Sequence, residues 1–350
     1  ATVYEKSAEI IRMFKKILGR EKFLEGMNQF FTNQDGCACT LEDFQKDFEL
    51  VLDKNLEKFF KWFHEPGTPK LAVSEKFVGK NYKVTFRQEK PINHRKYSIK
   101  VMPITYKILN SKGQFLQPEK TLVLDEETTS IALKNLSKKP AISLLNSFSA
   151  PVIVEFKQSI DDLFAILEFE TDFTSVWMTK KKLDNIVLEK KTSDQPSVEI
   201  VISRIYEILI KKVHTPSLLA KLLEPLSHNE YFSRLLETTT PDPKAIQTDL
   251  RKYEDLYKRY FKEFSITFFK SFIHNRQYLR ENSNYQERLL ACALMFLNKG
   301  TNFLDDFLDI IFNSSNNMSL KVSCLVNYIG RNDKKENIKK FYLQYGKNKV

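Results

Sequence analysis

Apolar residues recur at three- and four-residue spacing through the first 65 residues, as they do along one face of an amphipathic helix. The first such run contains Ile10, Ile11, Phe14, Ile17 and Leu18. The later runs contain a further set of large side chains, namely Phe23, Leu24, Met27, Phe30, Phe31, Leu41, Phe44, Phe48, Val51, Leu52, Leu56, Phe59, Phe60 and Phe63. The pattern predicts consecutive helices.

Turn and capping residues separate these predicted helices. Gly19 follows the first run where a helix C-cap is expected, and the composition of residues 33–36 predicts a turn. Thr40 is predicted to cap the next helix, with Asp43 at the capping-box position, so Asp43 is interpreted as a cap. The last helix has to end before Pro66-Gly67-Thr68-Pro69, because this segment cannot continue it.

Beyond Pro69 the apolar period changes from helical to two, which is typical of half-buried strands. Glycine at position 113 suits the left-handed position of a hairpin turn that spans 110–113. The predicted strands contain Tyr82, Val84 and Phe86; Tyr97, Ile99 and Val101; Ile104–Ile108; Thr121–Leu124; and Thr129–Leu133. Together they predict a small β-sandwich.

The helical period returns after residue 158. It predicts helices over 159–168, 174–189, 197–212 and 216–225, followed by long helical runs to the end. No strict internal repeat is visible. The predicted fold class is therefore multidomain and mostly α with a small β-sandwich.

Composition narrows the class of protein. With 42% hydrophobic and 28% charged residues in 350, the chain has the balance of an ordinary globular protein, and no apolar run approaches the length of a membrane span. The formal net charge is +11, but residues 1–67 carry ten Lys or Arg against twelve Asp or Glu. The basic excess is scattered over the remainder, which favours a solvated surface over a nucleic-acid site. The four cysteines form no disulfide framework and are interpreted as reduced.

Three motifs in order carry a resemblance to a known family. They are Thr2-Val3-Tyr4-Glu5-Lys6-Ser7-Ala8-Glu9, the segment Asp35-Gly36-Cys37-Ala38-Cys39-Thr40, and Trp62-Phe63-His64-Glu65-Pro66-Gly67-Thr68-Pro69. The chain resembles the zinc aminopeptidases of the aminopeptidase N family, bacterial type, with Ser7 in place of that family's usual glycine. Later matches are weaker.

Two of these later matches depart from the family's pattern. Phe148-Ser149-Ala150-Pro151-Val152 is similar to the family's exit from its sandwich, but Asn146 stands where the family has an arginine. Asp172-Phe173 followed by Trp177 is similar to a D-F-x-R-W segment and also lacks its arginine. The resemblance therefore implies that the partners of those arginines differ here.

The resemblance implies three domains. Residues 1–67 would be the C-terminal helices of a thermolysin-like catalytic domain, residues 68–157 a β-sandwich, and residues 158–350 an incomplete α-helical array. The family's H-E-x-x-H metal motif and G-x-M-E-N segment are missing from the sequence, whose histidines are His64, His94, His214, His228 and His274. No metal ligand and no cofactor-binding residue is therefore assigned, and the chain is expected to be a fragment that starts just before the catalytic tyrosine.

The resemblance assigns Tyr4 as the catalytic residue. In the family a zinc-activated water attacks the first peptide carbonyl, and a tyrosine hydroxyl donates to the oxygen on which negative charge builds. One oxyanion donor contributes about 2.7–4 kcal/mol to lowering such a barrier. The parent protein is thus expected to be a zinc-dependent aminopeptidase that removes N-terminal residues from peptides, and this chain alone is expected to be inactive.

A second interpretation belongs to a different class of protein. The chain could be a non-catalytic helical interaction protein derived from a decayed aminopeptidase, which the two missing arginines favour. An upstream H-E-x-x-H segment in the same reading frame would separate the two. For the enzyme we expect peptide substrates, no nucleic-acid or membrane partner, a monomer and a cytoplasmic location.

Overall fold

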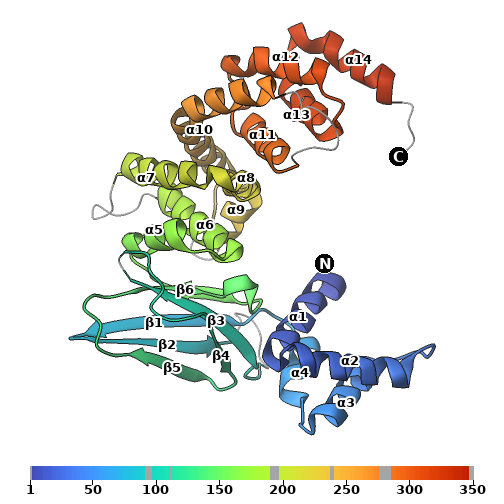
Figure 1. Ribbon diagram of the computed structural model, residues 1–350, viewed down its shortest axis with the longest axis vertical. Helices are drawn as coiled ribbons and strands as arrows, with labels where there is room; N and C mark the ends of the chain where they lie inside the picture. The colour runs from blue at the N-terminus through green and yellow to red at the C-terminus, as the bar shows by residue number, and fades with distance from the viewer. Residues whose placement is uncertain are drawn as a thin grey trace. The chain divides into compact units, whose positions relative to one another are not determined.

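The computed structural model describes residues 2–90, 97–110, 112–189, 197–236, 240–275 and 285–346. Main-chain packing groups the chain into two units, Ala1–Val176 and Trp177–Val350. Figure 1 shows the order of elements along the chain, which is helices, then two small sheets, then helices. The predicted fold class, mostly α with a small β-sandwich, is confirmed, while the domain limits at residues 67 and 157 stay predictions.

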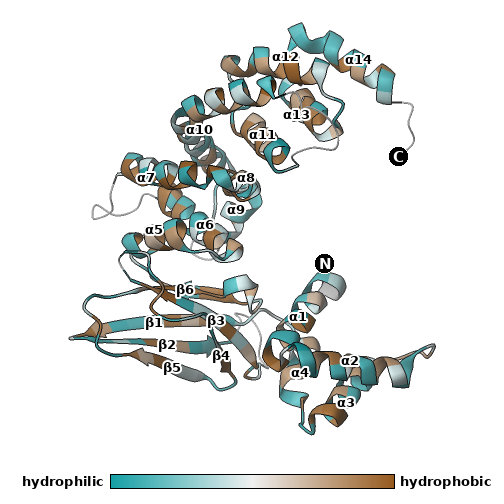
Figure 2. Ribbon diagram, viewed as in Figure 1, coloured by the Kyte–Doolittle hydropathy of each residue, from teal (hydrophilic) through white to brown (hydrophobic). Residues whose placement is uncertain are grey.

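The first unit begins with four α-helices that share one aromatic core. They are α1 (Ser7–Leu18), α2 (Arg20–Gln34), α3 (Leu41–Leu52) and α4 (Glu57–His64). The Phe14 ring of α1 lies 5.1 Å from that of Phe48 in α3 and 4.7 Å from that of Phe59 in α4, measured between centroids. Figure 2 shows hydrophobic and hydrophilic residues alternating along these helices.

The predicted capping box at the start of α3 is confirmed. The Thr40 hydroxyl accepts a hydrogen bond from the Asp43 main-chain N–H at 3.2 Å, and the Asp43 carboxylate accepts one from the Thr40 N–H at 2.9 Å. The reciprocal bonds satisfy two main-chain donors that the helix itself leaves unpaired. Asp43 is committed to this cap.

The predicted apolar stripe of α2 is partly wrong, because Leu24 and Phe31 are 46% and 57% exposed. The buried centre of the helix is Gly26, where an added Cβ would lie 2.2 Å from the Phe48 ring. Because α2 approaches α3 closely at Gly26, the face of α2 with Met27 packs toward α3. Leu24 and Phe31 lie at the edge of this packed face.

The β-region of the first unit forms two sheets. The four-stranded sheet has the order β5-β2-β1-β7 and the three-stranded sheet the order β4-β3-β6. The strands are β1 (Lys70–Val78), β2 (Asn81–Glu89), β3 (Met102–Leu109), β4 (Lys120–Leu124), β5 (Thr128–Leu133), β6 (Ala141–Leu144) and β7 (Ile153–Phe156). The predicted inward set of β2, Tyr82, Val84 and Phe86, is fully buried. Sequence periodicity missed β1, β6 and β7.

The predicted hairpin turn at 110–113 is confirmed by the hydrogen bonds from the Gly113 N–H to the Asn110 oxygen at 3.0 Å and from the Asn110 N–H to the Gln114 oxygen at 2.9 Å. The strands on either side of this loop are β3 and β4. The two strands pair antiparallel from Met102↔Leu124 to Tyr106↔Lys120, and Gly113 has φ of +79° in the connecting loop. An added Cβ on Gly113 would lie 2.2 Å from the ring of Phe169, at the end of α5 (Ile160–Phe169). Glycine is required here both by the backbone conformation and by the close contact. Ser111 of this turn lies outside the described residues.

The predicted strand around Tyr97, Ile99 and Val101 is wrong. Residues 97–101 form no strand, and the side chain placed on the outer face, Lys100, is the buried one at 1% exposure. Its ammonium donates to the main-chain oxygen of Lys61 at 2.9 Å and to the carboxylate of Glu65. A specific ion pair overrides the alternation of polar and apolar residues.

The second unit contains α-helices and short 3-10 turns among its described residues. The helix α6 (Phe173–Glu189) begins just before it. The others are α7 (Val198–Ile210), α8 (Pro216–Leu222), α9 (His228–Leu235), α10 (Pro243–His274), α11 (Tyr285–Leu297), α12 (Asp305–Ser314), α13 (Met318–Tyr328) and α14 (Lys335–Tyr345). Across the described ranges, no helix is both long enough and apolar enough to cross a membrane.

Candidate active-site segment

Tyr4 lies in the π-helical turn Thr2–Lys6, which runs directly into α1. The sequence predicted an ordinary helix start at this point. A π-helical turn closes hydrogen bonds over five residues rather than four, is rare, and occurs frequently at functional sites. The segment that carries Tyr4 therefore differs from a regular helix end.

The Tyr4 side chain is 84% exposed. This exposure excludes a core-packing role for its ring. The phenol group is consequently open to solvent, and a neutral phenol can donate one hydrogen bond to an incoming group. Ser7 is the first residue of α1 and follows Lys6 in right-handed helical conformation, so the backbone here does not require glycine.

Arg12 joins α1 by hydrogen bonds to the start of the Phe148-Ser149-Ala150-Pro151-Val152 motif. Its guanidinium donates to the main-chain oxygens of Ser147 and Phe148 and lies 5.5 Å from the centroid of the Phe148 ring. Both residues have left-handed φ values, 56° and 49°, which cost energy for side chains with a Cβ. The Arg12 contacts hold this strained turn and thereby join the first motif of the sequence to a later one.

The Trp62-to-Pro69 motif is hydrogen-bonded to the segment just before β3. The indole N–H of Trp62 donates to the main-chain oxygen of Val101 at 2.8 Å, and the Glu65 carboxylate accepts from the Ser98 hydroxyl at 2.6 Å. Burial would raise the pKa of Glu65, but the hydrogen bonds from Lys100 and Ser98 outweigh it and lower that pKa to about 2. Glu65 is thus a structural anion.

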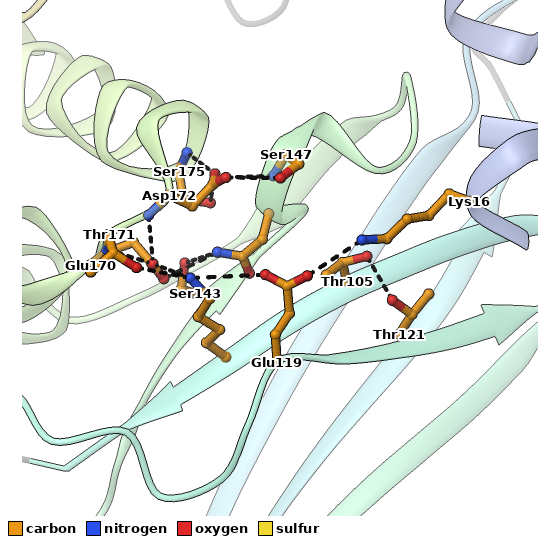
Figure 3. A network of polar contacts seen from close by, with 12 residues as sticks. Lys16, Thr105, Glu119, Thr121, Ser143, Ser147, Glu170, Thr171, Asp172 and Ser175 are labelled. Carbon is orange, nitrogen blue, oxygen red and sulfur yellow. Dashed lines mark hydrogen bonds and ion pairs between the residues drawn. The ribbon is translucent and has the colours of Figure 1, made fainter. Parts of the chain in front are cut away.

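Asn146, which stands where the family has an arginine, is fully buried beside another carboxylate. Its side-chain NH2 donates to Oε2 of Glu170 at 3.1 Å and to the Ser143 hydroxyl at 3.3 Å. The positive charge for Glu170 comes instead from Lys107 of β3, whose Nζ lies 2.8 Å from Oε1. Figure 3 shows this network, which continues through Glu119 to Lys16 of α1.

Asp172 also has its own partners without the arginine of the family's segment. It accepts hydrogen bonds from the main-chain N–H groups of Ser147 at 2.9 Å and Ser175 at 2.8 Å. The pKa of Asp172 is lowered, since these bonds outweigh the effect of burial. Asp172 therefore joins the start of α6 to the same turn that Arg12 holds.

The described residues do not fit a metal site. Within the ranges given above, no group of three or more His, Cys, Asp or Glu residues could hold a metal ion. His64 is exposed and Glu65 is bound to Lys100, while His94 lies outside the described residues. Cys37 and Cys39 are free and exposed.

Two buried charged side chains of this region, Lys107 and Glu170, could not be predicted from the local sequence. Lys107 lies on a predicted strand, and Glu170 belongs to no motif that the sequence pattern singles out. Their role as an ion pair arises only because the fold brings the two side chains into contact. A buried charge usually requires a counter-charge, so a search for cations near the Asn146 motif is the one signal that could have found Lys107.

The fold has three successive parts, which are helices with an exposed tyrosine on a π-helical turn, a two-sheet sandwich, and further helices. This order of parts defines the class of protein. Residues 1–63 match the peptidase family M1 domain, and residues 67–157 match a domain of unknown function with an Ig-like fold. The two matched segments therefore follow each other in the order that the motifs predicted.

The resemblance to bacterial aminopeptidase N is confirmed by the individual relatives. The chain is 28% identical over 345 residues to aminopeptidase N of Escherichia coli, covering 93% of this chain and 39% of that protein. It is 31% identical over 179 residues to aminopeptidase N of Haemophilus influenzae, covering 48% of this chain and 21% of that protein. The chain thus spans about two fifths of the length of the Escherichia coli protein.

A solved structure shows the same fold. The crystal structure of Legionella pneumophila aminopeptidase A in complex with aspartic acid superposes with a TM-score of 0.79 and 24% identity. The match covers 99% of this chain and 41% of that chain. At this level of identity the likeness concerns the fold alone.

Proposed function

We propose that this chain is part of a zinc-dependent aminopeptidase, in which Tyr4 stabilises the oxyanion formed when the first peptide bond of a substrate is attacked. The observation that carries the proposal is the exposed Tyr4 on its π-helical turn, inside the segment that matches the M1 domain. A lone tyrosine at a helix start otherwise usually lies in the core or on the surface, so the family motif is what distinguishes Tyr4.

The chemistry follows from the phenol group. As the peptide carbon becomes tetrahedral, negative charge builds on its oxygen, and a donor already held in place stabilises that charge more than it stabilises the ground state. The turn that carries Tyr4 runs directly into α1. This helix is held in place by its core contacts and by the hydrogen bonds of Arg12. The turn that carries the donor is thus continuous with a packed helix.

The sequence lacks the family's H-E-x-x-H motif, and the described residues supply no metal site. We therefore propose that the zinc ion would be held by residues outside this chain. When bound, it would supply the Lewis acid for hydrolysis. The chain by itself is then inactive as a hydrolase. The proposal further includes peptides as substrates, a monomeric state and a cytoplasmic location.

The test compares this chain with a protein extended upstream through an H-E-x-x-H segment, using hydrolysis of a chromogenic alanyl amide. Only the extended protein should hydrolyse it. In that protein Tyr4→Phe should lower kcat by about 100- to 1000-fold, the cost of one oxyanion donor. Tyr342→Phe, at another exposed tyrosine, is the matched control and should retain wild-type activity. Activity of Tyr4→Phe within a factor of two of the wild type would refute the role of Tyr4.

The second candidate, a non-catalytic interaction protein, is favoured by one observation. Tyr285, Leu289 and Phe296 form a stripe along α11 and are 68%, 37% and 56% exposed. Apolar residues at this spacing suit a partner helix. If the extended, folded and zinc-loaded protein hydrolyses no alanyl amide, this interpretation replaces the first.

A further inference from the structure

Arg12 is the residue through which α1 contacts the turn at Ser147 and Phe148. Its terminal nitrogens donate to the main-chain oxygens of those two residues, which lie 135 and 136 positions further along the chain. Its Nε donates to Oε2 of Glu9, one helical turn earlier, at 2.8 Å. A guanidinium is planar and holds its donors in a fixed fork. The Glu9 carboxylate therefore orients the group with which Arg12 binds the turn.

These bonds restrict α1 in a way that its core contacts do not. Three buried apolar side chains hold the helix against the aromatic core, namely Ile10, Met13 and Phe14. Apolar contact is non-directional, whereas a hydrogen bond depends on both a distance and an angle. Lys16 adds one polar contact to Glu119, at 3.3 Å. Arg12, which binds two acceptors of one turn, therefore defines the rotation of α1 about its axis more closely than these contacts do.

Tyr4 and Arg12 lie on the same side of this helical segment. Residues four apart form one ridge along the surface of a helix, and Tyr4, Ala8 and Arg12 follow this spacing. All three are exposed, as expected of a ridge on the side away from the core. A rotation of α1 about its axis would therefore carry Tyr4 and Arg12 in the same direction. The bonds that hold Arg12 thus also restrict the direction in which Tyr4 points.

The turn that accepts these bonds is strained and is held by a second contact. Leu145, Ser147 and Phe148 have left-handed φ values of 55°, 56° and 49°. Such conformations persist where the surrounding contacts over-determine them, and they cluster at functional sites. Asp172 accepts hydrogen bonds from the Ser147 N–H at 2.9 Å and from the Ser147 hydroxyl at 3.0 Å (Figure 3). Because Asp172 also holds the turn, it offers Arg12 a fixed point of attachment.

We infer that Arg12 is a positioning residue, which sets the direction in which Tyr4 presents its phenol to the substrate. The inference rests on the proposed function, because it concerns the hydrogen bond that Tyr4 donates to the oxyanion. That bond gains its strength in the transition state, so a misdirected donor lowers kcat and leaves KM nearly unchanged. A misplacement of about 1 Å, caused by a substitution far from the chemistry, lowers a rate by as much as about 100-fold.

The test uses the zinc-loaded protein extended upstream through an H-E-x-x-H segment and measures hydrolysis of an alanyl amide. Arg12→Ala should lower kcat by about tenfold or more and change KM by less than about twofold. Arg12→Lys keeps the charge but loses the fork, so its kcat should lie between those of the wild type and Arg12→Ala. Lys15→Ala, at an exposed lysine of the same helix, is the matched control and should retain wild-type kcat. A change in KM alone, or equal kcat for Arg12→Ala and Lys15→Ala, overturns the inference.

A double-variant cycle separates positioning from a general structural role. In a Tyr4→Phe background no donor is left to direct, so adding Arg12→Ala should lower kcat no further. If Tyr4→Phe is impaired and Arg12→Ala lowers kcat by the same factor in both backgrounds, the inference fails and the proposed function stands. If Tyr4→Phe is as active as the wild type, the proposed function fails and the inference fails with it. Circular dichroism checks the folding of each variant, and Arg12→Lys replaces Arg12→Ala in the cycle if the latter does not fold.

Discussion

The Glu170 carboxylate is buried, and its Oε1 lies 2.8 Å from Nζ of Lys107. This pair joins the end of α5 to the central strand β3. Burial would raise the pKa of Glu170, but Lys107 and the surrounding hydrogen bonds outweigh it, so that the pKa is lowered. The pair therefore gives the buried Glu170 carboxylate a counter-charge, which the neutral Asn146 amide cannot supply.

Breaking this pair should destabilise the first unit. Lys107→Met leaves the Glu170 carboxylate buried without a cation, and such a loss costs about 3–5 kcal/mol. The free energy of unfolding is measured with urea through Trp62 fluorescence in a Trp177→Phe background. Lys120→Met, at an exposed lysine on neighbouring β4, is the control and should change it by less than about 0.5 kcal/mol. Similar small effects of both variants would show that the pair contributes no stability.

The Gly113 contact gives a second prediction. Gly113→Ala forces a Cβ into the Phe169 ring and places it at φ of +79°, so we expect a loss of about 2–4 kcal/mol. Gly79→Ala is the matched control, because Gly79 has φ of +61° in another turn of the sandwich with no atom within 4 Å of the added Cβ. Its loss should be about 1 kcal/mol. Urea unfolding of the two variants checks the difference, and equal losses would mean that α5 yields to the added methyl group.

The regular parts of the fold could be predicted from the sequence because they depend on local patterns. Helical spacing located α1 to α4, and the cap at Thr40 is a contact between residues three apart in the chain. Alternation located β2 and the β3–β4 hairpin. These signals arise within one element and need no knowledge of its neighbours.

The remaining features depend on contacts between distant residues. Lys100 is buried where alternation predicts an exposed side chain, because Glu65 lies 35 positions away in sequence and bonds to it. Lys107 and Glu170 are 63 positions apart. The motif around Tyr4 was recognisable, but its π-helical winding was not, since the local residues are also compatible with an ordinary helix.

The acid stability of the first unit should depend on Glu65. Its pKa falls from the ordinary 4.5 to about 2 on folding, so the folded state favours the carboxylate. This contribution is fully present above pH 4.5 and is lost as the pH falls toward about 2. Glu65→Gln removes it, and the difference in free energy of unfolding between wild type and variant should therefore shrink as the pH is lowered. Glu57→Gln, at an exposed glutamate of α4, should follow the wild type, and a pH-independent difference for Glu65→Gln would contradict the assignment.

The second unit contains a buried ion pair between successive turns of α6. Nζ of Lys180 lies 2.7 Å from Oδ2 of Asp184, and the Tyr257 hydroxyl of α10 donates to Oδ1 at 2.7 Å. Both charged side chains are at most 1% exposed. Burial lowers the pKa of Lys180, and the nearby Asp184 charge opposes this effect. Each of the two charges is therefore stable in this buried position only when the other is present.

Removing one charge of this pair should cost more than removing both. Lys180→Met leaves a buried carboxylate and should destabilise the second unit by about 3–5 kcal/mol. Lys180→Met combined with Asp184→Asn removes both charges, keeps an acceptor for Tyr257, and should recover much of that loss. Amide hydrogen exchange of α10, followed by mass spectrometry, reads the stability of this unit directly. Asp184→Asn alone completes the comparison. If the double variant loses as much stability as the two single variants lose together, the two charges do not stabilise each other.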